Sequence, residues 1–194
     1  MENNETLSPN ESLKLIESMI HKAQNRFSEN GTLYLLWGWV VFFCSIIQYL
    51  LLKFTTYTNA SMIWLVTILI LIYQVFYLSK KHKKEKVKTY TDEIIGYVWT
   101  TFGICMGLFT LIMVKLNVWM LFYPFIFLFY GIPTFLSGAI MRFKPLMFGG
   151  ICCWILSIAA IFLTSLEVIL LFIPAVLFGW IIPGYLLRAR FKSA

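Results

Sequence analysis

Ionisable side chains are scarce in this chain and are missing from its long apolar stretches. Of its 194 residues, 13% are charged and only two are histidine, whereas soluble domains average about a quarter charged. No Asp, Glu, Lys, Arg or His lies deep inside an apolar run. A charge inside a bilayer is costly and usually marks an ion or proton pathway. This absence argues against a proton-coupled pump, a voltage sensor and an ion-coupled transporter.

Motifs for catalysis and metal binding are also missing. The sequence contains no H-E-x-x-H and no G-x-S-x-G pattern, and neither histidine lies in an apolar run. The four cysteines lie inside apolar runs without the spacing of a zinc or redox pair: Cys44, Cys105, Cys152 and Cys153. We therefore expect no enzymatic activity, no cofactor and no metal site.

Apolar residues, in contrast, are in excess. They make up 60% of the chain, and the mean hydropathy is +0.79. A chain of this length buries only about 70% of its unfolded surface, so a soluble fold would leave much of this material in water. The composition excludes a soluble enzyme, a secreted disulfide scaffold and a disordered tail. It indicates an integral membrane protein.

Six apolar runs are long enough to cross a bilayer, which takes about 20 residues. They lie near residues 32–52, 60–79, 94–114, 118–140, 146–165 and 168–187. The connections are short, so successive spans are expected to be antiparallel neighbours. The expected fold class is all-α: a polytopic membrane helix bundle with six transmembrane helices in residues 31–194, preceded by a cytoplasmic segment, residues 1–30.

Lysine and arginine lie almost entirely on one side of this bundle. The N-terminal segment, the second and fourth connections and the tail hold 14 of them, and the other side holds Lys53 and Lys115. Because basic residues gather in short cytoplasmic loops, both termini are expected in the cytoplasm. Trp37 and Trp64 are expected at the inner and outer interfaces. The net charge of +7 thus reports orientation, and no nucleic acid partner is expected.

The N-terminal segment predicts an amphipathic helix over residues 9–29. Asn30-Gly31 supplies the left-handed stop expected behind it. Its basic and acidic residues balance, and helices that lie on anionic membranes usually carry a basic face. A neutral helix suits docking onto protein: this chain's own loops, a second copy or a cytoplasmic regulatory protein. The partner-binding candidates are the apolar residues at helical spacing, Leu13, Ile16, Ile20 and Phe27.

The densest charge cluster follows the second span. Its first four lysines are Lys80, Lys81, Lys83 and Lys84. They are candidates for contact with anionic lipid headgroups, worth about 1 kcal/mol per basic residue near the surface. The same lysines are equally well explained as topology determinants.

Polar and small residues inside the spans predict contacts between helices. Gln48 and Gln74 are the strongest polar groups in the spans and are expected to hydrogen bond to another helix. Gly103 and Gly107 on the third span have the spacing that lets helices approach closely. That contact is expected inside the monomer, with dimerisation as the alternative.

The last two hairpins match at several positions. Two pairs of prolines correspond at an offset of 50 residues: Pro124 and Pro133, Pro174 and Pro183. A parallel duplication of residues 94–142 and 144–192 would explain these matches, and so would coincidence between apolar segments.

Prolines bend helices and free backbone carbonyls one turn earlier, so spans four and six are expected to be the most irregular. A solute path, if the protein has one, is expected between them. Its lining would be Tyr130, Pro133, Thr134, Trp180, Pro183 and Tyr185. The alternative is that the prolines are static kinks that shape the bundle.

One region of the chain resembles a known group. The runs Ser12–Ile20 and Arg26–Trp39, the second containing N-G-x-x-Y-x-x-W-G-W, resemble a family of uncharacterised bacterial multispan membrane proteins. The resemblance covers about residues 12–40. It implies a location in the bacterial cytoplasmic (inner) membrane. Such proteins tend to be encoded beside small winged-helix regulators, which implies a sensory or regulatory role, and the resemblance transfers no site residues.

Two functions follow as expectations. The first is a non-enzymatic regulatory or interaction module that works through protein or lipid contacts, because the spans lack catalytic and ion-handling groups. The alternative is a small carrier for a neutral or lipophilic solute, which uses the proline-kinked spans four and six.

Overall fold

The computed structural model describes residues 12–14, 31–55, 59–84, 90–118 and 121–192. Every regular element in these residues is helical, and residues 12–14 form a helical turn. The elements are α2 Gly31–Phe54, the 3-10 turn η2 Ala60–Trp64, α3 Leu65–Lys84, α4 Tyr90–Leu116, α5 Phe122–Ile140, α6 Lys144–Ala160, α7 Ser165–Leu170, α8 Phe172–Val176, the π-helical turn η4 Leu177–Ile181 and α9 Ile182–Lys192. The expected all-α class is confirmed for the described part of the chain.

Five described segments are long and apolar enough to cross a membrane. They are Gly31–Phe54, Ala60–Lys80, Glu93–Leu116, Phe122–Ile140 and Leu166–Arg190. The fifth span expected from the sequence, 146–165, corresponds to α6, a shorter apolar helix of 17 residues. This architecture is compatible with a multi-pass membrane protein.

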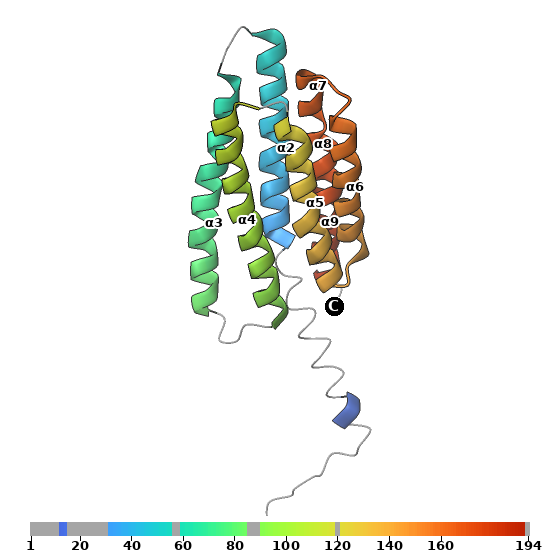
Figure 1. Cartoon of the computed structure of the whole chain (residues 1–194). Helices are drawn as coiled ribbons and strands as arrows, with labels where there is room; N and C mark the ends of the chain where they lie inside the picture. The colour runs from blue at the N-terminus through green and yellow to red at the C-terminus, as the bar shows by residue number, and fades with distance from the viewer. Residues whose placement is uncertain (1–11, 15–30, 56–58, 85–89, 119–120, 193–194) are drawn as a thin grey trace, which may run out of the picture.

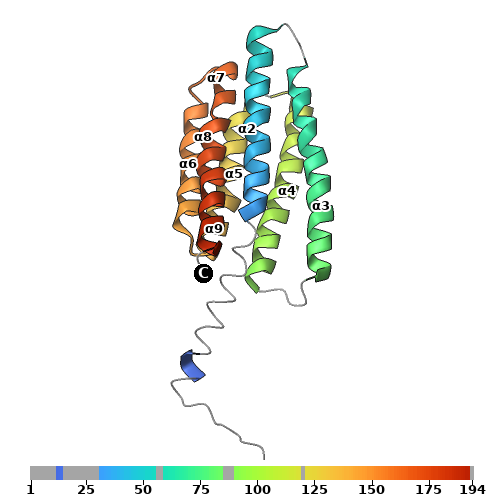
Figure 2. The same cartoon turned by 180° about the vertical axis from the view of Figure 1, so that it is seen from behind.

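Helix α2 lies at the centre of the bundle. Figures 1 and 2 show α3 and α4 on one side of it and α5, α6 and the α7–α9 segment on the other. α2 packs along the whole of α7–α9, and α5 packs most extensively on α6. α3 and α4 make few contacts with each other. Figures 1 and 2 nevertheless show these two successive spans side by side, and α4 makes closer backbone contacts with α5 than with α3.

The core lies where α2, α5, α6 and α7–α9 meet. Each of these segments contributes at least one large side chain that is at most 1% exposed, such as Val41, Phe127, Leu146 and Phe172. By contrast, no residue in the most apolar stretch of Ala60–Lys80 is buried, and few are in Glu93–Leu116. The bundle thus has a core of four helical segments and two peripheral helices.

Glycines bring the backbones of the core helices together. A Cβ on Gly150 would lie 2.8 Å from the Phe135 nitrogen of α5, and one on Gly149 would lie 2.4 Å from the Phe178 oxygen of η4. α6 therefore sits within backbone contact of two neighbours. A small residue is needed at these positions because any side chain would push the helices apart.

Gly31 has a role that differs from the expected one. It begins α2 without a positive φ, and a Cβ there would lie 2.9 Å from the Gly184 oxygen of α9. The left-handed stop expected at Asn30-Gly31 is therefore not at Gly31, and Asn30 lies outside the described residues. Its lack of a side chain lets α2 approach α9.

The last segment is irregular where its prolines demand it. A proline lacks the N–H that would bond to the carbonyl four residues earlier, and its ring crowds that carbonyl. The α7–α8 break at Leu171 falls one turn before Pro174, and the π-turn Leu177–Ile181 contains the residue four before Pro183. In α5, Pro124 lies in the first turn, where no such bond exists, and the helix runs unbroken through Pro133. Irregularity therefore concentrates in the last segment.

The offset of 50 residues recurs in the backbone. Helix α5 begins at Phe122 and α8 at Phe172. Just before them, the Leu121 N–H donates to the Val118 carbonyl and the Leu171 N–H donates to the Val168 carbonyl. The two hairpins nevertheless pack differently. In the first, α5 packs mainly on α6; in the second, the α7–α9 segment packs mainly on α2. The duplication of residues 94–142 and 144–192 stays a prediction.

Candidate functional sites

The N-terminal partner-binding candidates are described at one position. Leu13 lies on the helical turn of residues 12–14 and is 64% exposed. Ile16, Ile20 and Phe27 lie outside the described residues, as does most of the predicted helix 9–29. Of the four candidates, the structure therefore describes Leu13 alone, and its side chain is exposed.

The lysine candidates for lipid contact lie on a helix. α3 extends to Lys84, five residues beyond the predicted end of the second span, so Lys80, Lys81, Lys83 and Lys84 occupy its last turns. Lysine is a good helix former and does not end a helix by itself. The Lys80 side chain is exposed. The backbone therefore carries these four lysines out along the axis of α3.

Three of the six cavity candidates meet inside the bundle. The Trp180 indole N–H of η4 donates to the Thr134 hydroxyl of α5 over 3.1 Å, and the Tyr130 and Trp180 ring centroids are 4.9 Å apart. The Thr134 hydroxyl in turn donates to the Tyr130 carbonyl over 2.7 Å. Trp180 thus occupies the space between α5 and η4 and is anchored there by its polar edge.

The remaining cavity candidates divide into two groups. Pro133 and Pro183 are less than 2% exposed and belong to the packed core. Tyr185 on α9 is half exposed and lies outside the buried cluster. The structure therefore brings together Tyr130, Thr134 and Trp180, buries the two prolines and leaves Tyr185 half exposed.

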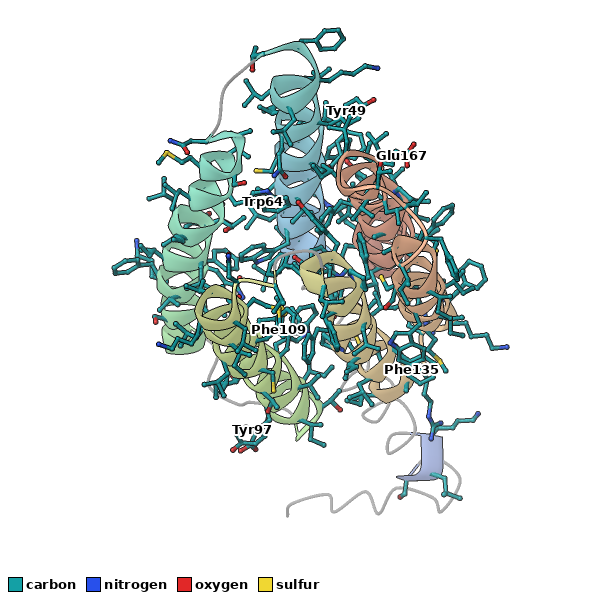
Figure 3. All side chains as sticks on the ribbon, turned by 45° about the horizontal axis from the view of Figure 1, so that its top comes forward. Tyr49, Trp64, Tyr97, Phe109, Phe135 and Glu167 are labelled. Carbon is teal, nitrogen blue, oxygen red and sulfur yellow. The ribbon has the colours of Figure 1, made fainter. Side chains whose placement is uncertain are left out.

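A column of aromatic rings continues from this cluster in both directions. Phe172 and then Trp64 follow on one side of Tyr130, with centroid distances of 6.4 and 5.3 Å. Trp99 and then Tyr34 follow on the other side of Trp180, at 6.2 and 5.9 Å. Figure 3 shows Trp64 in the middle of the bundle, with Tyr97 and Glu167 at its edges. The column joins the peripheral helix α4 to the core.

Both glutamines of the spans accept a hydrogen bond from a tryptophan. The Trp37 indole of α2 donates to Gln74 of α3, and the Trp64 indole of η2 donates to Gln48 of α2 over 2.8 Å. The prediction of interhelical partners for Gln48 and Gln74 is confirmed. Sequence reasoning did not identify the two indole donors, because Trp37 and Trp64 also fit the interfacial aromatic belts. The signal that could have found them is a glutamine on the facing span.

α2 supplies the donor of one of these bonds and the acceptor of the other, and the two bonds lie far apart along the helix axes. Each tryptophan comes first in its segment and the glutamine follows ten or eleven residues later, which is about 16 Å along a helix. Because α2 and α3 are antiparallel, each tryptophan meets the other helix's glutamine. The pair of bonds fixes the register of α3, which otherwise contacts the core little.

The buried hydroxyls of the described residues mostly serve packing. Ser45 donates to the Phe42 carbonyl, and Ser157 of α6 donates to the Pro124 carbonyl of α5 over 2.7 Å. All four cysteines are free thiols. Among the described residues no group of three or more His, Cys, Asp or Glu side chains could hold a metal ion. Of the two serine bonds, that of Ser45 lies within α2 and that of Ser157 joins α6 to α5.

The small-residue face of α4 has no partner within the described structure. A Cβ on Gly96, Gly103 or Gly107 would meet nothing within 4 Å. The expectation that Gly103 and Gly107 pack inside the monomer is therefore wrong for the described residues. α4 packs on α5 through a different face, which includes Phe109 and Met113.

No family model, no curated protein and no solved structure matches this chain.

Proposed function

We propose that the chain is a six-span protein of the bacterial cytoplasmic membrane with both termini in the cytoplasm. Five described segments have the required length and composition, and α6, with 17 residues, is the sixth. At 1.5 Å per residue α6 is about 26 Å long, close to the roughly 30 Å hydrocarbon core. The 14-to-2 division of Lys and Arg supports this orientation.

Within that membrane the chain acts as a non-enzymatic, regulatory interaction module. The observation that carries this proposal is the exposed Leu13, which lies on a helical turn within a stretch of apolar residues at helical spacing. The predicted helix is electrically neutral, which suits a protein surface better than an anionic bilayer. Its partner would be a second copy or a cytoplasmic regulatory protein.

The interior of the bundle supports a module over a carrier. The Trp–Gln pairs and the Trp180–Thr134 bond use polar side chains to join helices. Tyr130, Thr134 and Trp180 contact one another directly in the region where a solute path was expected. Tight packing of this kind favours static kinks over a moving gate.

The experiment compares two charge-matched double variants of the full chain in its native membrane. Leu13→Glu with Ile20→Glu places two charges on the apolar stripe. Ser18→Glu with Asn25→Glu places the same charges on the polar side of the predicted helix. Association is measured by cross-linking and quantitative mass spectrometry and by energy transfer between labelled copies.

The stripe variant should lose its partner or its self-association, while the matched variant keeps it. Helix content and thermal unfolding of both variants should equal those of the wild type, because the bundle is untouched. Equal association in all three proteins would disprove the interaction role of the N-terminal segment.

The end of α3 adds a proposed lipid contact. Lys80, Lys81, Lys83 and Lys84 would attract anionic headgroups, at about 1 kcal/mol each near the surface. Replacing all four by glutamine should reduce the anionic lipid that co-purifies with the protein, as measured by native mass spectrometry. If the amount of co-purified lipid is unchanged, these lysines serve only to set the orientation of the protein in the membrane.

A further inference from the structure

Two buried hydroxyls, one on α2 and one on α5, lack a hydrogen-bond partner among the described residues. They belong to Tyr34, which is 7% exposed, and Ser137, which is fully buried. The Tyr34 hydroxyl lies beside both the Ser137 side chain and the Trp99 side chain of α4. Polar groups of three helices therefore converge at one point.

Such a pair is unusual in this bundle. The hydroxyls of Ser45, Thr134 and Ser157 are also buried, and each donates to a backbone carbonyl. Removing a hydroxyl from water without a replacement bond is unfavourable, and folded proteins pair nearly all such groups. By geometry, the Tyr34 and Ser137 hydroxyls thus retain hydrogen-bonding capacity that no described side chain fills.

A water molecule has the matching chemistry. The two hydroxyls each donate once and also accept, whereas the Trp99 indole only donates. A water that accepts two hydrogen bonds and donates two can serve all three, and buried waters typically have two to four polar partners. Tyr34 lies one turn inside the start of α2 and Ser137 one turn before the end of α5. The site is therefore near the end of the bundle, where water can enter.

We propose that Tyr34, Ser137 and Trp99 hold a buried water molecule that links α2, α4 and α5. α4 otherwise meets the core through apolar and aromatic side chains such as Phe109. The water adds a polar link at Trp99, which comes before the α4 residues whose aromatic rings contact α5. This site is independent of the N-terminal segment, so its test does not depend on the proposed function.

The first test detects the water directly. The full chain, labelled with 15N at its tryptophans and held in nanodiscs, is examined for magnetisation transfer between water and each indole N–H. Trp99 should show a long-lived water contact, assigned by its disappearance in Trp99→Phe. The Trp37 and Trp180 indoles, which donate to Gln74 and Thr134, are internal controls. The Trp99 signal should vanish in Tyr34→Phe and in Ser137→Ala.

The second test is a double-mutant cycle on unfolding in mixed micelles. Tyr34→Phe and Ser137→Ala should each lower the folding equilibrium constant about fivefold, the usual effect of one hydrogen bond. The double variant should lose little more than either single variant, because the three groups share one water. Ser157→Ala, which removes a direct bond to the Pro124 carbonyl, should be additive with Tyr34→Phe.

Two results would overturn the proposal. Higher stability of Tyr34→Phe or Ser137→Ala would mean that the hydroxyls are truly unpaired. A strong coupling with no water signal at Trp99, or with a signal that persists in both variants, would mean a direct bond between the two hydroxyls.

Discussion

Replacing glycine by alanine should have opposite effects on two helices of this bundle. At Gly149 of α6, an added Cβ would lie 2.4 Å from the Phe178 oxygen and 2.7 Å from the Gly179 Cα. Both are backbone atoms and cannot rotate away. At Gly103 of α4, an added Cβ would meet nothing within 4 Å. The two substitutions are chemically identical and differ only in what surrounds them.

The magnitudes follow from two effects. Overpacking that forces a backbone shift costs about 1–3 kcal/mol, and alanine favours a helix over glycine by up to about 1 kcal/mol. Gly149→Ala has both effects and should lower the free energy of unfolding by about 1–2 kcal/mol. Gly103→Ala has only the second and should leave stability unchanged or slightly raised. The gap of about 2 kcal/mol corresponds to about 30-fold in the unfolding equilibrium.

The assay is reversible unfolding of the full chain in mixed micelles, followed by circular dichroism. Gly107→Ala provides a second exposed control, because a Cβ there also meets nothing within 4 Å. Equal stability of Gly149→Ala and Gly103→Ala would refute the packing argument. A loss of stability in Gly103→Ala, with a change in particle mass by light scattering, would show that the α4 face contacts another copy.

Three further substitutions test other contacts of the bundle. Gln74→Leu removes the acceptor of the Trp37 indole and should lower the free energy of unfolding by about 0.5–1.5 kcal/mol in micelles. Thr134→Val keeps the side-chain shape but leaves the buried Trp180 N–H unpaired, which should cost about 1–3 kcal/mol by the same measurement. Pro183→Ala restores a backbone donor, so the π-turn should regularise and the indole resonance of Trp180 should shift; an unchanged resonance would contradict this cause of the turn.

Some features of the fold follow from local sequence alone. Each span is recognisable because about 20 apolar residues in a row have one favourable solvent, the bilayer. The same reasoning predicted irregular helices in spans four and six; it is right for the last segment, where Pro174 and Pro183 remove backbone bonds, and wrong for α5, which runs unbroken through Pro133. Gln48 and Gln74 were identified as helix-contact residues because an amide in the hydrocarbon region needs a partner.

Other features depended on distant residues. Trp37 and Trp64 were expected at the interfaces, and their glutamine partners became evident only when α2 and α3 were seen side by side. Gly31 has the sequence context of a helix stop, but the approach of Gly184 decides its role. Gly103 and Gly107 have the spacing of a helix contact, but no described helix lies there.

The sequence by itself indicated an all-helical chain with several apolar segments long enough to cross a membrane. Only the tertiary structure decided which helices form the core. Ala60–Lys80 and Leu166–Arg190 are both strongly apolar, yet the most apolar stretch of the first has no buried residue and half of the second is buried. In a bilayer, lipid tails and neighbouring helices are equally apolar. Hydropathy therefore cannot separate a lipid-facing helix from a core helix, whereas close glycine contacts and paired polar groups can.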